Sequence, residues 1–213
     1  MTTGNREDYL INILRLTEKR SVAKTTELAS MMDVSAASVS EMLKTLSNEG
    51  MVNYQKYKGV SLTQEGFEYA TQLRRKHHIM ERFLINVLES DMDTAHEEAH
   101  KMEHVISDES ADKMCRILGP TDECDDCKES CGIKGSRSTT TVSMMPSQSS
   151  GKVSHVKCGN PEHLRKLMSM GFVPGRPVKI DSVSKSGPVI VHIGDCSVAM
   201  DRVLTDMVYV DMN

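Results

Sequence analysis

The chain has 213 residues, enough for one to three small domains, with 38% hydrophobic and 26% charged residues, as in soluble proteins. No stretch approaches the roughly 18 apolar residues of a membrane span. We therefore expect a cytoplasmic protein whose six cysteines are thiols or metal ligands and not disulfides. Residues 77–132 hold 15 Asp and Glu against five Lys and Arg, which suits a cation site better than a nucleic-acid surface, whereas both ends of the chain are net positive.

The first third of the chain predicts a helix-turn-helix. Apolar residues at helical spacing predict one helix over 6–17 and another over 25–32. Ser35 then follows a short turn as a capping residue, and a third helix over 36–48 stops at Gly50. Two helices joined by a three-residue turn are typical of DNA-binding helix-turn-helix proteins.

Residues 51–62 alternate about a turn at Lys58-Gly59, which predicts a small basic hairpin, the wing of a winged helix. Small polar side chains on the exposed face of the third helix can approach phosphates and base edges in a major groove. The alternative is the same set of helices and hairpin without a DNA role, but the order of elements favours DNA binding. The residues expected to contact DNA are Thr26, Ser35, Ala36, Ala37, Ser38, Ser40, Glu41, Lys44, Lys56 and Lys58.

The middle third predicts three more helices, over 63–88, 94–106 and 108–118. They cannot bury all of their apolar residues against one another, so we expect a dimer interface here. A winged-helix protein that reads a palindrome also needs a two-fold axis.

Histidines and carboxylates gather in these helices, where five of the eight histidines fall within residues 77–104. Side chains three or four positions apart share a helix face, so two helices can offer imidazole and carboxylate ligands to one divalent transition metal. The alternative is a solvated polar face. The residues concerned are His77, Glu81, His96, His100, Glu103 and His104.

Three cysteines follow at C-x2-C-x3-C spacing, namely Cys124, Cys127 and Cys131. With a fourth ligand they can hold Zn(II) or an iron–sulfur cluster; alternatively they are redox-active thiols or belong to an ordinary surface loop. Residues 134–152 are polar and of low complexity, which predicts a flexible linker.

The last segment, 153–213, predicts a small β-barrel preceded by a short helix from Pro161 to Met170. The expected strands cover residues 177–183, 189–193, 197–200 and 208–210.

These features resemble the diphtheria-toxin-repressor family of iron- and manganese-dependent transcriptional repressors, over about residues 5–120. The matching motifs are Glu7-Asp8-Tyr9-Leu10, Ser35-Ala36-Ala37-Ser38-Val39-Ser40, Leu62-Thr63-Gln64-Glu65-Gly66, the run from Arg75 to Leu84 and the run from His96 to His104. The fold that the resemblance implies is mainly α with small β elements. Its parts are a winged-helix DNA-binding domain (1–73), a helical dimerisation and metal-binding domain (74–133), the linker (134–152) and an SH3-like FeoA-type domain (153–213).

The resemblance implies two metal ions per subunit. The regulatory position is expected at Asp8, His100, Glu103 and His104, and the ancillary position at His77, Glu81 and His96. In iron-type members the C-terminal domain lends a ligand to the ancillary position. His163 is the candidate for that ligand here, and the alternative is a solvent-exposed residue at the start of a helix.

The identity of the metal stays open between Fe(II) and Mn(II). Residues 167–175 and 187–189 resemble an accessory domain of ferrous-iron transport systems, which favours iron. Asp8 occupies a position where manganese-type members place Asp and iron-type members Met, which favours manganese.

The function implied is repression by a metal-loaded homodimer bound to palindromic operator DNA of metal-homeostasis genes. A regulator that senses through Cys124, Cys127 and Cys131 is the alternative. We expect no enzyme, small-molecule substrate or membrane partner; the sequence lacks a nucleophile elbow and a phosphate-binding glycine loop.

Overall fold

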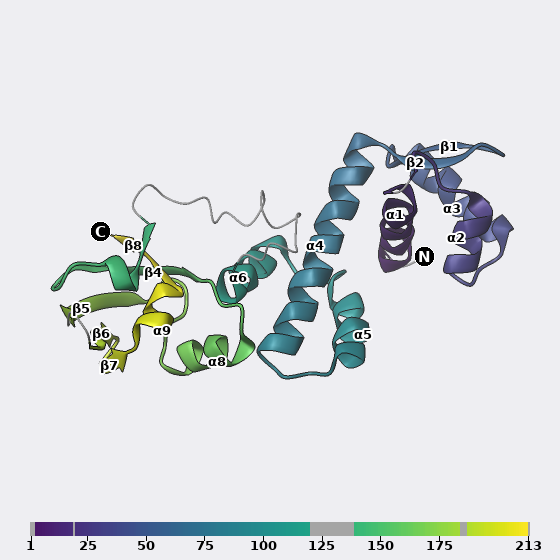
Figure 1. Cartoon of the computed structure of the whole chain (residues 1–213). Helices are drawn as coiled ribbons and strands as arrows, with labels where there is room; N and C mark the ends of the chain where they lie inside the picture. The colour runs from purple at the N-terminus through teal and green to yellow at the C-terminus, as the bar shows by residue number, and fades with distance from the viewer. Residues whose placement is uncertain (1–2, 19, 120–138, 184–186, 213) are drawn as a thin grey trace. The chain divides into compact units, whose positions relative to one another are not determined.

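The computed structural model describes residues 3–18, 20–119, 139–183 and 187–212 (Figure 1). The chain forms two compact units: residues 1–77 with 100–105, and residues 78–99 with 106–213. Within the described ranges, no helix combines the length and apolarity that crossing a bilayer requires.

The first unit contains the predicted winged helix-turn-helix. Its elements are α1 (Thr3–Thr17), α2 (Thr25–Met31), α3 (Ala36–Asn48), β1 (Val52–Gln55) and β2 (Gly59–Leu62). The apolar stripe of α1 is buried in one core with α2, α3 and the hairpin. Strands β1 and β2 pair antiparallel, with Val52 opposite Leu62.

Local chemistry fixes the turn and the hairpin. The Ser35 hydroxyl caps α3 by accepting a hydrogen bond from the Ser38 N–H at 3.1 Å. Gly59 has a φ of +111°, and a Cβ there would lie 2.4 Å from the Ala23 carbonyl oxygen. Only glycine therefore lets β2 approach closely enough for Ala23 and Val60 to exchange backbone hydrogen bonds.

Three further helices follow: α4 (Gln64–Asn86), α5 (Met92–Met102) and α6 (Asp108–Leu118). Helix α4 passes without a break through the predicted domain border at 73/74. Helix α5 ends at Met102 and not at residue 106, so Glu103 and His104 lie in a turn. The expected helical stripe of His96, His100 and His104 is therefore interrupted before its last member.

The second unit holds a six-stranded antiparallel sheet of order β3-β8-β4-β5-β6-β7, which confirms a small C-terminal β domain. Its elements are β3 (Thr139–Thr141), the 3-10 helix η1 (Val142–Met144), β4 (Ser150–Val156), α8 (Pro161–Ser169), β5 (Pro177–Val183), β6 (Val189–Ile193), β7 (Cys196–Met200), α9 (Arg202–Asp206) and β8 (Val208–Met212). The buried side chains of the sheet share one core with those of α6.

The structure corrects the predicted linker, since residues 139–152 contain β3, η1 and the start of β4. Thr139–Thr141 pair with Tyr209–Asp211 of β8, and Val142 and Met145 are buried. Threonine-rich polar sequence suits an edge strand as well as a linker, because β-branched residues favour strands. The rest of the predicted linker and the three clustered cysteines lie outside the described residues.

Candidate metal centre and nucleic-acid interface

Four side chains of the first unit converge on one point. Asp8 comes from α1, His100 from the end of α5, and Glu103 and His104 from the turn after it. Each offers a ligand atom within 4.8 Å of the others. His104 Nε2 lies 3.1 Å and His100 Nε2 3.6 Å from Asp8 Oδ1. The structure thus brings together the four residues expected at the regulatory position, and their role as ligands stays a prediction.

Glu103 lies at the centre of this group and is only 1% exposed. Its Oε2 is 2.6 Å from His77 Nδ1, and its Oε1 is 3.1 Å from His100 Nδ1. A carboxylate withdrawn from water needs such partners, because its uncompensated burial is costly. Glu103 therefore joins the expected regulatory residues to His77, which was assigned to the ancillary position.

The other ring nitrogen of His104 contacts Glu7, a residue for which no role was predicted. Glu7 is buried, its Oε2 lies 2.6 Å from His104 Nδ1, and its Oε1 accepts a hydrogen bond from the Tyr69 hydroxyl. If the Glu7 carboxylate accepts a hydrogen bond from Nδ1, Nε2 is the ring nitrogen that can offer a lone pair to a metal ion.

The donor set fits a cation. Asp8 Oδ1 is buried and accepts no hydrogen bond, although His104 Nε2 faces it at 3.1 Å. Glu103 Oε1 also lies 3.4 Å from His104 Nε2. Such a set of imidazole nitrogens and carboxylate oxygens suits a divalent metal.

The residues expected at the ancillary position form a second group of potential ligands, and their role as ligands stays a prediction. His96 Nδ1 lies 3.1 Å from Glu81 Oε1, and His77 precedes Glu81 by one turn of α4. His163 is on α8, and the groups of potential ligands found among the described residues do not include it. Its assignment to this position therefore receives no support from the structure.

The groups of potential metal ligands found among the described residues contain no cysteine. Cys115 is buried in the core of the second unit. Burial raises the pKa of the Cys158 thiol to about 11, so this residue stays protonated near neutral pH and is a poor metal ligand. Cys124, Cys127 and Cys131 are among the residues that the structure does not describe.

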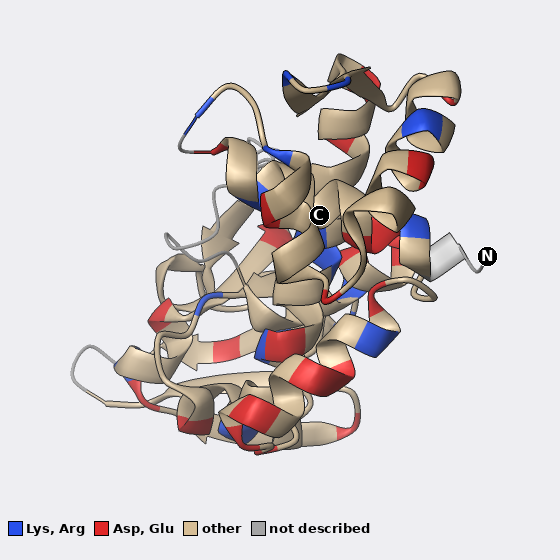
Figure 2. Cartoon of the chain, turned by 90° about the vertical axis from the view of Figure 1, so that its right-hand side faces the viewer, with Lys and Arg blue, Asp and Glu red and all other residues tan. Residues whose placement is uncertain are grey.

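Basic and acidic residues are interspersed along the ribbons (Figure 2). No long segment of the described chain is coloured by basic residues alone, so the expected DNA interface would depend on local groups of cations. One such group surrounds a cavity of about 390 Å³ between α2, α3 and the wing. It is lined by Lys24, Thr25, Thr26, Ala36, Ser40, Tyr54, Lys56, Tyr57, Lys58 and Gly59.

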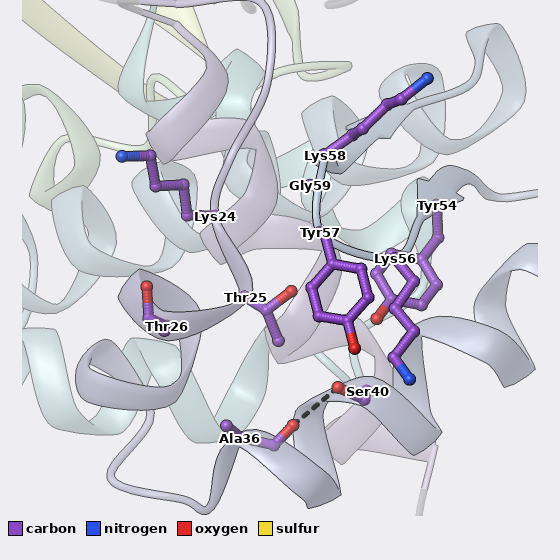
Figure 3. Close-up of a pocket in the computed structure, with 10 residues that line it drawn as sticks. All are labelled: Lys24, Thr25, Thr26, Ala36, Ser40, Tyr54, Lys56, Tyr57, Lys58 and Gly59. Carbon is purple, nitrogen blue, oxygen red and sulfur yellow. Dashed lines mark hydrogen bonds between the residues drawn. The ribbon is translucent and has the colours of Figure 1, made fainter.

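The cavity is lined by five of the ten expected DNA contacts and by two tyrosines, Tyr54 and Tyr57. In Figure 3 the Tyr57 ring extends towards Ser40 of α3, while the side chains of Lys24, Lys56 and Lys58 point outwards in different directions. Tyr57 is 92% exposed, and the Lys56 ammonium lies 5.0 Å from its ring centroid. Its φ of +68° is unusual for an aromatic residue, so the hairpin turn holds the ring out at a conformational cost.

The other five expected contacts, all on or next to α3, are Ser35, Ala37, Ser38, Glu41 and Lys44. All five are exposed, as a surface that meets DNA requires. Hydrophobic periodicity did not identify Lys24, Thr25 or Tyr57 as residues that line this cavity. An aromatic residue between two lysines in a predicted turn was the signal available for Tyr57.

Models of three domain families match the chain. The N-terminal DNA-binding domain of iron-dependent repressors matches residues 1–60, and their metal-binding and dimerisation domain matches residues 63–132. A FeoA domain matches residues 140–212.

Curated relatives agree with these matches. An uncharacterized HTH-type transcriptional regulator of Methanocaldococcus jannaschii is 41% identical over 109 residues, 51% of this chain and 87% of that protein. The regulator MntR of Bacillus subtilis is 29% identical over 125 residues, 59% of this chain and 87% of MntR. The diphtheria toxin repressor of Corynebacterium glutamicum is 30% identical over 112 residues, 53% of this chain and 49% of that repressor.

The crystal structure of the metal-dependent transcriptional regulator MtsR is similar over the full length of both chains. Its TM-score is 0.51 and its sequence identity 25%.

Proposed function

Because the chain belongs to the diphtheria toxin repressor and MntR family of metal-dependent transcriptional repressors, we propose that Fe(II) at Asp8, His100, Glu103 and His104 activates it. In that state a homodimer binds palindromic operator DNA of metal-homeostasis genes, in the cytoplasm. The members of this family are transcriptional regulators and not enzymes.

The observation that carries the proposal is the convergence of acceptors around Asp8 Oδ1, a buried oxygen without a hydrogen-bond donor. A divalent cation bound there supplies the positive charge that the two carboxylates and two imidazoles lack. Asp8 and Glu103 contribute oxygen, and His100 and His104 contribute nitrogen.

The chain's connectivity explains how such a site can control DNA binding. Residues 100–105 pack with the DNA-binding domain but are flanked in sequence, at 99 and 106, by the second unit. Asp8 lies on the first helix of the DNA-binding domain. A metal ion that joins residues 100–105 to Asp8 restricts the orientations that the DNA-binding domain can adopt. Metal favours the DNA-competent state because it binds that state more tightly than the others.

His77, Glu81 and His96 form the proposed ancillary position, with two ions per subunit in total. The close pair of His96 and Glu81 and the position of His77 one turn away support this assignment. Glu103 can transmit the state of this position to the regulatory one, because its Oε2 is hydrogen-bonded to His77.

Iron is proposed over manganese because a FeoA domain follows the dimerisation domain. Among the described residues, the proposed regulatory ligands are imidazoles and carboxylates, without a sulfur ligand. This donor set also suits Mn(II), which is therefore the competing metal.

A dimer is proposed from the matched dimerisation domain and from apolar side chains left in water. Leu88 and Met92 of the second unit are 59% and 72% exposed. Such residues gain free energy when a second copy covers them.

Mobility-shift titrations under anaerobic conditions test the proposal, with Fe(II), Mn(II), Co(II) and Zn(II) added separately to the parent, Asp8→Ala and His104→Ala. We expect the parent to bind DNA at the lowest concentration with Fe(II), and both variants to lose the metal response while remaining dimeric. His192→Ala, at an exposed histidine of the C-terminal sheet, is the matched control and should respond like the parent. A metal response retained by either variant contradicts the site, and activation by Mn(II) at lower concentration than Fe(II) contradicts iron.

A further inference from the structure

Glu7 lies at the junction of three elements of the first unit. It is on α1, its Oε1 accepts the Tyr69 hydroxyl hydrogen bond from α4, and its Oε2 is 2.6 Å from His104 Nδ1 in the turn after α5. The Glu7 side chain is 7% exposed and that of His104 15%. Both carboxylate oxygens are therefore engaged in a site largely closed to water.

Successive residues of α1 reach opposite nitrogens of one imidazole. Glu7 lies against His104 Nδ1, and Asp8 lies 3.1 Å from His104 Nε2. The ring cannot turn about its Cβ–Cγ bond without losing its Glu7 hydrogen bond. The same hydrogen bond fixes which nitrogen carries the hydrogen and which presents a lone pair.

We propose that Glu7 is a positioning residue for the regulatory metal, acting through His104 and anchored by Tyr69. The inference rests on the proposed function, since it assumes that His104 Nε2 is a metal ligand. A carboxylate that accepts from the outer nitrogen of a ligand histidine orients the ring and raises the basicity of the inner nitrogen. Loss of such a partner typically lowers metal affinity about 10- to 100-fold.

The position of Glu7 gives it a second consequence. Because its hydrogen bond to His104 needs no metal, it holds α1 near residues 100–105 in the metal-free chain. The ligands are then already close when metal arrives, and less ordering is required on binding. A carboxylate with a purely structural role would stabilise the fold without changing the His104 tautomer or the metal affinity of the folded protein.

Two measurements distinguish a positioning role of Glu7 from a purely structural one. Both are made on the parent, Glu7→Ala and Glu7→Gln. The first is nitrogen-15 NMR of histidine-labelled, metal-free protein, which reports the His104 tautomer directly. We expect the Nδ1–H form in the parent, its loss in Glu7→Ala, and its retention in Glu7→Gln, whose amide oxygen still accepts. The second is calorimetric titration with Mn(II), in which Glu7→Ala should bind about 10- to 100-fold more weakly and Glu7→Gln should lose less.

Controls separate positioning from folding. Glu49→Gln removes a half-exposed carboxylate of the same domain that pairs with Arg6, and it should leave tautomer and affinity unchanged. Tyr69→Phe removes the anchor and should weaken Mn(II) binding less than Glu7→Ala does. Circular dichroism melting checks that each variant is folded, and the near-isosteric Glu7→Gln keeps the test valid if Glu7→Ala does not fold.

An Nε2–H tautomer in the parent overturns the inference, and so does Mn(II) affinity within two-fold of the parent in folded Glu7→Ala. If the parent shows no metal binding that depends on Asp8, the proposed function is overturned instead, and with it the role of Glu7 towards metal. In that case the tautomer measurement still shows whether Glu7 holds His104.

Discussion

At the scale of single residues, Glu103 is the side chain on which the metal centre most depends. Its two oxygens contact three histidines, and it is nearly inaccessible to solvent. It also contacts both His77 and the group around Asp8. A change of its charge therefore affects fold and metal binding together.

Glu103→Gln tests this dependence. The substitution keeps the side-chain volume but turns one acceptor oxygen into a donor. One of the three histidines that Glu103 contacts then loses its hydrogen-bond acceptor. Leaving a buried donor unsatisfied costs about 1–3 kcal/mol, so we expect a urea midpoint shifted downwards by that free energy in the metal-free protein. Metal affinity should fall by more than about 100-fold, the upper end of the range for loss of a residue that only hydrogen-bonds to a ligand.

Urea denaturation and Mn(II) titration measure the two effects. Glu98→Gln makes the same substitution at an exposed position of α5 and should change neither quantity. A Glu103→Gln protein as stable and as metal-avid as the parent would show that the carboxylate is not a ligand.

At the scale of elements, the sequence predicts best what neighbouring residues determine. The periodicity of α1 and α3, the Ser35 cap and the glycine in the hairpin turn are local signals, and the winged helix-turn-helix follows from them. Strand β3 was missed because its stability comes from β8, with Thr139 opposite Asp211. Glu7 was missed for the same reason, since its partners lie 62 and 97 residues away.

The end of α5 shows a further limit of periodicity. A spacing of four residues predicted that His104 extends the helical stripe, yet the helix stops at Met102. The turn that follows is what allows His104 to face both Glu7 and Asp8. Residue type and spacing thus selected side chains that the structure brings together, while their geometry depends on tertiary contacts.

The wing supplies a prediction at this scale. Tyr57 projects from the β1–β2 turn beside α3 (Figure 3) and borders the cavity with Lys56 and Lys58. Tyr57→Asn removes the ring, and asparagine tolerates the positive φ, so the hairpin is retained. We expect metal-activated DNA binding to weaken by about 1–3 kcal/mol, the range for loss of a direct contact.

Fluorescence anisotropy with a labelled duplex measures this change at fixed metal and salt concentrations. Met144→Asn replaces another exposed large side chain, in η1 of the second unit, and should bind DNA like the parent. If Tyr57→Asn binds DNA with the affinity of the parent, the wing tip is not part of the DNA interface.

At the scale of the whole molecule, the proposed function has metal and DNA act on one conformational equilibrium of the chain. The proposed ligands join α1 to residues 100–105, and the residues expected to contact DNA lie on α2, α3 and the wing of the same unit. If metal stabilises the orientation that DNA selects, then DNA must stabilise the orientation that metal selects. The two coupling factors are equal by thermodynamic necessity.

This reciprocity gives a quantitative prediction that needs no substitution. If saturating metal raises DNA affinity by a given factor, typically about 5- to 150-fold, then saturating duplex must raise metal affinity by that factor per dimer. Calorimetric titration of metal into the protein with and without duplex provides one side of the comparison, and anisotropy with and without metal provides the other. Asp8→Ala should bring both factors to about one, because this variant removes the ligand that α1 contributes. Unequal factors in the parent would mean that metal binds the duplex itself or changes the oligomeric state, and equal factors retained in Asp8→Ala would place the coupling outside the regulatory site.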